Sequence, residues 1–441
     1  MKNAKKSFLM LAAFLMMAVQ GFAADVKGSV KQNIVHGINY QLTAKKQVAT
    51  VIKNPQGYQG EIIIPEKITI DSVTYYVEAI APEAFRDCSG VTSISIPKSI
   101  AKIGNGAFRG CSSLKTIAIP KTISELPSAL FQDCASLTAI DLPRTINRIS
   151  TDVFRGCKSL ESFTLPSAIT ALPTGSFAGC SNLRQLELPS GLTTLGNNVF
   201  QDCTSLETLT LPTGLKNVGE HVFMGCSSLQ SMELPSGMNR VPAWFFENCS
   251  SLTQVQLPNS IGVIRHDAFN GCVSLDSIYL PNSIRELESA AFANCTNLRK
   301  VNIPNGILEL SANLFRNCTS LAAIDLPASL REIGSHTFDN CSNLKRIVLP
   351  AALKKIGGDA FERCTSLVEV FAQGAAPAKI SASSFAKSTY RESSLLVRFG
   401  TVSNYQIDKN WNRFLDMVEV NDQGKPITKE EASQQQQTQL R

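Results

Sequence analysis

The sequence predicts a β-rich solenoid, in which the chain winds into about 13 coils of 23 residues between an N-terminal and a C-terminal cap. Two observations support this fold class. All 13 cysteines, from Cys88 to Cys364, follow one another at intervals of 23 residues, and a fixed period of this size marks a repeat architecture. The composition, 44% hydrophobic and 18% charged, is that of a folded chain.

Other columns of residues keep the same register as the cysteines. A Phe precedes each Cys by three residues, a Leu follows by three in all repeats but that of Val91, and a Pro follows by nine until Gln373. In a representative repeat these columns, continued into the next one, are Phe108, Cys111, Leu114, Pro120, Phe131 and Cys134.

This pattern predicts a short strand in every repeat. Ile117 and Ile119 should point into the core, while Ala118 points outward, because side chains alternate along a strand. Pro120 lacks an N–H and should end the strand. One coil cannot bury this apolar set alone, so coils stacked about 4.8 Å apart would form one continuous core.

At these columns the chain resembles the leucine-rich-repeat superfamily. It is most similar to the 23-residue class named after Treponema pallidum, found in BspA-like surface proteins of Bacteroidetes. The likeness covers roughly residues 60–372 and is clear in Cys111-Ser-Ser-Leu114-Lys-Thr-Ile117-Ala-Ile119-Pro120. The resemblance implies a protein-binding surface whose partners are host extracellular proteins or other bacteria.

The first residues have the layout of a secretory signal peptide. Three lysines precede an apolar run from Phe8 to Val19, and small residues follow it, so we predict a signal peptide over 1–23. The alternative is a membrane anchor, but 12 residues are too few to span the hydrocarbon layer. Removing the three lysines lowers the formal net charge from +6 to +3, which is too balanced to favour nucleic-acid binding.

The rest of the chain divides by its agreement with the period. We expect a β-rich N-terminal cap over 24–80, the repeat solenoid over 81–372 and a C-terminal cap over 373–420. In the last of these, Trp411-Asn-Arg-Phe414 resembles the closing module of BspA-like proteins. The polar segment 421–441, with its run of glutamines, is predicted to be disordered.

The cysteine column has three interpretations. Neighbouring coils would bring the thiols within disulfide range, and thiolates bind metals. However, the number is odd, no C-x-x-C occurs, and the column stands among Phe and Leu. We therefore predict buried, free thiols, with no metal and no cofactor.

No catalytic constellation is evident. The four histidines lie far apart in the repeat, apart from His221 and His336, which share a column five coils apart, and none stands with a nucleophile and an orienting acid. We predict that the chain is not an enzyme; a hydrolase using scattered carboxylates is a distant alternative.

Ligand contacts on a solenoid come from outward positions. Trp244 stands in a column that other repeats fill with polar residues, so it either packs along the turn or contacts a ligand. The remaining candidates lie on the strand face: Tyr279, Arg299, Lys300, Lys345 and Arg346. Aromatic and Arg side chains are favoured at protein interfaces.

The function predicted from these features is adhesion or host and cell-surface interaction by an exported monomer, at the cell surface or secreted. The partner would be a protein, and no integral membrane span or nucleic-acid partner is expected. The alternative is a periplasmic or cell-envelope scaffold, because no lipoprotein Cys or recognisable sorting domain accounts for passage across an outer membrane.

Overall fold

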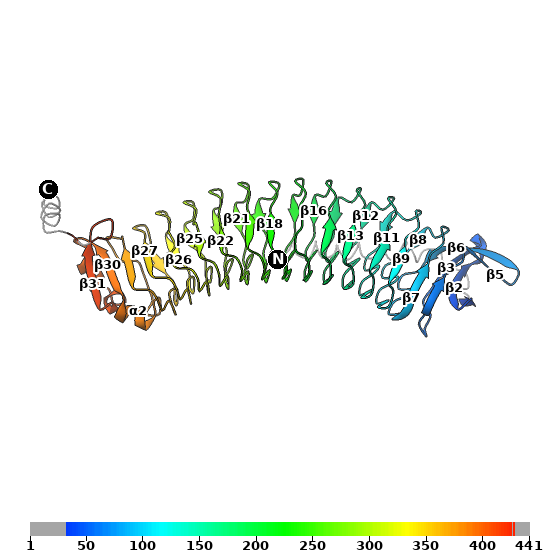
Figure 1. Ribbon diagram of the computed structural model, residues 1–441, viewed down its shortest axis with the longest axis horizontal. Coiled ribbons are helices and arrows are strands. Elements are labelled where there is room, and N and C mark those ends of the chain that lie inside the picture. Colours follow the sequence, from blue (N-terminus) through cyan, green and yellow to red (C-terminus); the bar gives the residue numbers. More distant parts are fainter. Residues whose placement is uncertain (1–31, 426, 428–441) are drawn as a thin grey trace, which may run out of the picture.

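The computed structural model describes residues 32–425 and 427. These residues form a long, curved solenoid (Figure 1), which makes about 15 turns of roughly 23 residues instead of the 13 expected. The predicted signal peptide, 1–23, and most of the tail predicted to be disordered, 421–441, lie outside the described residues.

Most coils contribute a strand to a first, parallel series; among the described residues, the coils of Cys203 and Cys318 form none at this position. Its strands are β4 (Gln59–Ile63), β7 (Gly90–Ser95), β9 (Thr116–Ala118), β11 (Ala139–Asp141), β13 (Ser162–Thr164), β15 (Gln185–Glu187), β18 (Ser231–Glu233), β20 (Gln254–Gln256), β22 (Ser277–Ile278), β24 (Lys300–Val301), β27 (Arg346–Leu349), β29 (Glu369–Ala372), β30 (Ser394–Arg398) and β31 (Asp416–Val420). The pairing follows the period, as where Ile140 pairs with Ile117. In β9 and the residue after it, the side chains alternate as predicted: Ile117 and Ile119 are buried and Ala118 is exposed.

A second parallel series consists of two-residue strands. These are β8 (Lys102–Ile103), β10 (Glu125–Leu126), β12 (Arg148–Ile149), β14 (Ala171–Leu172), β16 (Thr194–Leu195), β17 (Asn217–Val218), β19 (Arg240–Val241), β21 (Val263–Ile264), β23 (Glu286–Leu287), β25 (Glu309–Leu310), β26 (Glu332–Ile333) and β28 (Lys355–Ile356). After most of them the next residue donates its N–H to the preceding coil, as Gly219 does to Leu195 at 2.9 Å.

Proline interrupts the second series at three places. Pro127, Pro173 and Pro242 occupy the position of that N–H donor and cannot make its bond. Among the described strands, pairing accordingly lapses between β8 and β10, between β12 and β14, and between β17 and β19. Pairing also lapses between β23 and β25, where Ser311 holds the position, and nothing in the structure explains that break.

The core is built around a column of stacked phenylalanines. Successive rings lie 5.1 to 5.9 Å apart from Phe85 to Phe361, and most are nearly parallel. All 13 cysteines are buried and free. From Cys111 onward each thiol donates to a Phe carbonyl of the preceding coil, as Cys134 does to Phe108 at 3.1 Å. The sulfurs therefore help to hold neighbouring coils together.

Two turn positions in every repeat have left-handed backbone conformations. In each repeat, the residue directly before the Cys and the residue five positions before the same Cys have a positive φ, close to 55–75°. Gly, Asn and Asp tolerate this region best, which explains why they fill most of both columns. Arg363 in the first column and Trp244 in the second are the bulkiest exceptions, with φ of 56° and 54°.

At the N-terminal end, a mixed sheet covers the first coil, with antiparallel pairs except for β3 and β6, which pair in parallel. It comprises β1 (Gln32–Val35), β2 (Ile38–Thr43), the 3-10 turn η1 (Ala44–Lys46), β3 (Val48–Val51), β5 (Lys67–Ile70) and β6 (Val73–Ile80). β5 and β6 form a hairpin that turns at Asp71 and Ser72. Tyr58 ends the Phe column, with its ring 4.7 Å from that of Phe85.

At the C-terminal end, the coiling continues beyond the last regular repeat. β30 pairs in parallel with β29, and β31 with β30, while Phe385 stacks on Phe361 at 4.9 Å. Helix α2 (Lys387–Glu392), helix α3 (Val402–Gln406) and the 3-10 turn η2 (Trp411–Arg413) join these strands. Trp411 is fully buried and donates to the carbonyl of Ala378. The count of 13 coils was too low because coils without a Cys, at both ends, also stack on the array.

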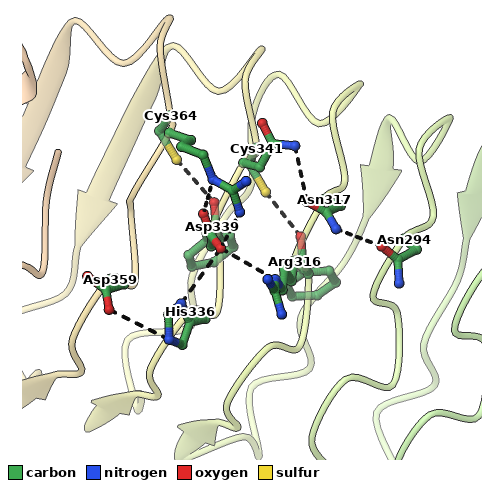
Figure 2. A network of polar contacts seen from close by, with 12 residues as sticks. Asn294, Arg316, Asn317, His336, Asp339, Cys341, Asp359 and Cys364 are labelled. Atoms are coloured by element: carbon green, nitrogen blue, oxygen red, sulfur yellow. Dashed lines mark hydrogen bonds and ion pairs between the residues drawn. The ribbon is translucent and has the colours of Figure 1, made fainter.

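A polar network follows the turns near the C-terminal end (Figure 2). Asn294, Asn317 and Asn340 form a ladder in which each amide donates to the Asn of the preceding coil, the first to Asn270. The next position in the column is Arg363, whose guanidinium makes two bonds of 2.8 and 2.6 Å to Asp339 instead.

Asp339 is the buried centre of this network. Its carboxylate is only 4% exposed, and Arg316 and His336 approach it at 3.4 and 3.6 Å. His336 also lies 3.6 Å from Asp359 (Figure 2). A buried carboxylate needs charged partners of this kind, so the network joins successive coils where the regular array nears its end.

Candidate binding surfaces

The strand face carries three of the predicted contact residues on adjacent coils. Tyr279 is 67% exposed, and β22, which it follows, pairs with β24, where Lys300 lies. Arg299 precedes Lys300 and makes an exposed ion pair of 3.7 Å with Asp276. An exposed pair at this distance stabilises the fold little, so both cations remain available to a partner.

Lys345 and Arg346 lie two coils further along the same face. Arg346 makes an ion pair with Glu369, and the backbone of Gly424 lies close to its guanidinium. Arg346 is therefore engaged by neighbouring residues, unlike Lys300. The structure places Lys345 and Arg346 apart from the group formed by Tyr279, Arg299 and Lys300.

Trp244 belongs to a different segment of the coil, the turn that leads to the Phe column. Its ring is half-buried and stacks on that of His221, with centroids 4.4 Å apart and an interplanar angle of 11°. His266 meets it edge-on at 4.0 Å. Trp244 thus packs along the turn, as one of the two sequence interpretations expected.

This cluster corrects the view that the histidines are scattered. His221 and His266 come from the coils on either side of Trp244 and both contact its ring. The sequence did not predict this pair because the two histidines stand in different columns: His221 is five residues before a Cys, and His266 is six residues before one. Burial lowers the pKa of His221, and nearby Glu220 partly offsets that effect.

A polar hollow opens beside this turn. Its volume is about 340 Å³, and it spans three successive coils where β17 and β19 fail to pair at Pro242. Lys216, Val218 and Arg240 are among the residues that line it. Neither cation forms an ion pair with any other residue that the structure describes. Sequence reasoning missed this hollow, although Pro242 was a signal for it.

Metal binding and thiol chemistry have little support at the cysteine column. Burial raises the pKa of the Cys134, Cys295 and Cys364 thiols to about 12, which disfavours the thiolate that binds metals or attacks disulfides. Across residues 32–425 and 427, no group of three or more His, Cys, Asp or Glu side chains is placed to hold a metal ion.

The stacked coils of about 23 residues, with their parallel strands and apolar columns, define the chain as a leucine-rich-repeat solenoid. A family model described as a BspA type leucine rich repeat region of six copies matches residues 78–203, 148–276 and 263–392. The protein therefore belongs to the BspA-type leucine-rich-repeat family. No curated protein matches the chain.

Two solved structures of bacterial proteins have a similar fold. A leucine-rich repeat protein from Bacteroides ovatus is 24% identical, with a TM-score of 0.59 over 79% of this chain and 94% of that one. A leucine rich cell surface protein from Faecalibacterium prausnitzii is also 24% identical, with a TM-score of 0.55 over 79% of this chain and 96% of that one. At this identity the likeness concerns the fold.

Two general properties follow from the family and the fold. Leucine-rich-repeat domains are typically scaffolds for protein interaction and are generally not enzymes. Within the described part of the chain, the helices are too short to cross a membrane.

Proposed function

We propose that this protein is an exported binding protein whose strand face contacts a protein partner at the cell surface, in adhesion or host interaction. The observation that carries the proposal is the group formed by Tyr279, Arg299 and Lys300 on two adjacent coils. A two-thirds exposed Tyr ring contributes nothing to the core, whereas Tyr and Arg are enriched at interface hot spots.

Export is supported by the predicted signal peptide over 1–23 and by the family to which the chain belongs. The same features are compatible with a periplasmic or cell-envelope scaffold, which stays the second candidate. We further propose that the protein acts as a monomer without catalytic activity, because a continuous solenoid offers one long face to a single partner.

The proposal is tested by binding of purified mature protein to a panel of extracellular matrix proteins, measured by biolayer interferometry. The Arg299→Ser/Lys300→Ser variant should weaken binding of the protein that is recognised. The matched control is Lys121→Ser/Arg144→Ser, which also removes one exposed Lys and one exposed Arg from adjacent coils, but off the strand face. Equal losses in both variants would contradict a specific strand-face contact.

A further inference from the structure

We propose that the hollow beside Pro242 binds an acidic side chain from an extended peptide segment of the protein partner. This inference rests on the proposed function, since it identifies the chemistry of the partner. Departures from the repeat concentrate in this part of the array: a broken strand ladder, two cations without ion-pair partners, and a Trp in a left-handed turn.

The break follows from the missing N–H of Pro242. In neighbouring coils the equivalent residues, Gly219 and Arg265, donate to the coil before them at 2.9 and 3.0 Å. Pro242 cannot do so, and the carbonyl of Val218 lacks that donor. A peptide N–H can supply it, as in recognition by strand addition.

The side chains at this break are also bulkier than elsewhere. Phe245 stands where other coils have Ala, Val, Leu, Ser or Thr, and its ring packs edge-on against Phe223 at 5.2 Å. This large buried ring lies three residues after Pro242 and next to Trp244, so it is a further departure from the repeat at the break.

The charge of the hollow selects an anion. Lys216 and Arg240 are exposed side chains that line it from successive coils, and Asn217 and Asn239 add amide donors and acceptors. Guanidinium and ammonium groups bind carboxylates through charge-assisted hydrogen bonds. Glu220 lies on the same coil as Lys216, but it is not part of the lining.

The size and lining of the hollow favour a peptide over a sugar. About 340 Å³ is at the lower end of the volumes of ligand pockets, enough for one side chain and its backbone. No aromatic ring lines the hollow, and the nearby Trp244 ring is already covered by His221 and His266. A sugar ring would therefore find no aromatic face to stack on.

The test uses the full mature chain and a fluorescein-labelled dodecapeptide of Asp, Glu, Ser and Gly, with binding followed by fluorescence anisotropy at low salt. An isosteric peptide with Asn and Gln replacing the acids is the negative control. We expect the acidic peptide alone to bind, and Lys216→Gln/Arg240→Gln to weaken it about tenfold, from two exposed charge pairs. Lys121→Gln/Arg144→Gln removes the same two charges from exposed positions outside both proposed binding surfaces and should leave this binding unchanged.

A second variant tests the role of the broken ladder. Pro242→Ser restores the N–H, as Ser150 provides in its own coil, and should close the hollow and weaken the peptide without changing any charge. Pro173→Ser repairs a different break and serves as its control. Circular dichroism confirms that each variant is folded.

The outcomes separate the possibilities. Equal weakening by Lys216→Gln/Arg240→Gln and by Lys121→Gln/Arg144→Gln would mean general attraction to a basic protein and would overturn the proposal. Binding of an oligomeric hexuronate, but not of the peptide, would also overturn it. The proposed function is tested separately. If the hollow does not bind the peptide but matrix-protein binding still depends on Arg299 and Lys300, only the proposal for the hollow fails.

Discussion

Replacement of Trp244 by Asn should cost less stability than the loss of a core aromatic residue, because it relieves a left-handed backbone strain while it removes a half-buried ring. The residue has a φ of 54°, in a region where a non-glycine side chain costs about 1–2 kcal/mol and Asn is better tolerated. Asn198 and Asn313 already occupy the same turn position with φ near 60°. The substitution therefore relieves strain while it removes a ring.

Relief of strain offsets only part of the loss. Removal of the two ring contacts, to His221 and His266, costs about 0.5–1.5 kcal/mol each, and the apolar area of the half-buried ring adds about 25 cal/mol per Å². Relief of the left-handed backbone returns about 1 kcal/mol. We expect a net loss of roughly 2 kcal/mol, compared with about 3–5 kcal/mol for truncating a fully buried aromatic residue.

The assay is equilibrium urea unfolding followed by circular dichroism, with Phe223→Ala as the reference for a core position, since Phe223 is fully buried. A cost for Trp244→Asn close to that of Phe223→Ala would refute the reasoning, because Trp244 would then be a core anchor. A small cost joined to weaker partner binding would support a contact role.

Three further predictions follow from the buried groups. Native protein should react poorly with a thiol reagent, and unreduced, denatured protein should titrate close to the 13 cysteines of the sequence; few titratable thiols would mean disulfides. Asp339→Asn should lower the free energy of unfolding by about 1–3 kcal/mol, because it weakens the charged bonds to Arg363, and urea unfolding that matches the wild type would contradict this. Because the folded-state pKa of His221 lies below its ordinary value of 6.5, the unfolded state binds more protons between those two values. Stability should then decrease as pH falls through that window, less so in His221→Asn, and identical pH profiles in urea melts would exclude the effect.

The repeat and its core were predictable from the sequence because they depend on strict periodicity. Cys111 and Leu114 recur in register, and each position must be apolar for the coils to stack. The Phe column is equally regular. Because burial requires the same residue type at the same position of every coil, one repeat protein shows that requirement in each of its repeats.

The end coils could not be counted because their period changes. Phe385 stacks on Phe361 although 24 residues separate them, and β30 lacks a Cys altogether. The extra residue lies between Ala372 and Lys379, because Ala372 still pairs with Leu349 at the regular spacing of 23, whereas Lys379 pairs with Lys355 at a spacing of 24. A search for a fixed period of 23 misses such coils.

The candidate contact residues were only partly predictable. The exposure of Tyr279 follows from strand alternation, and the structure agrees. The stacking of Trp244 between two histidines, and the hollow at Pro242, depend on contacts between coils at positions where the repeat tolerates any residue. Such contacts leave no periodic signal.

The measurement that tests the central claim most directly is labelling of intact cells of the source organism with a membrane-impermeant amine reagent, with a periplasmic protein as control. A binding protein displayed at the cell surface should be labelled in intact cells as fully as after the outer membrane is permeabilised. Labelling that appears only after permeabilisation, together with the periplasmic control, would contradict surface display and favour the cell-envelope scaffold.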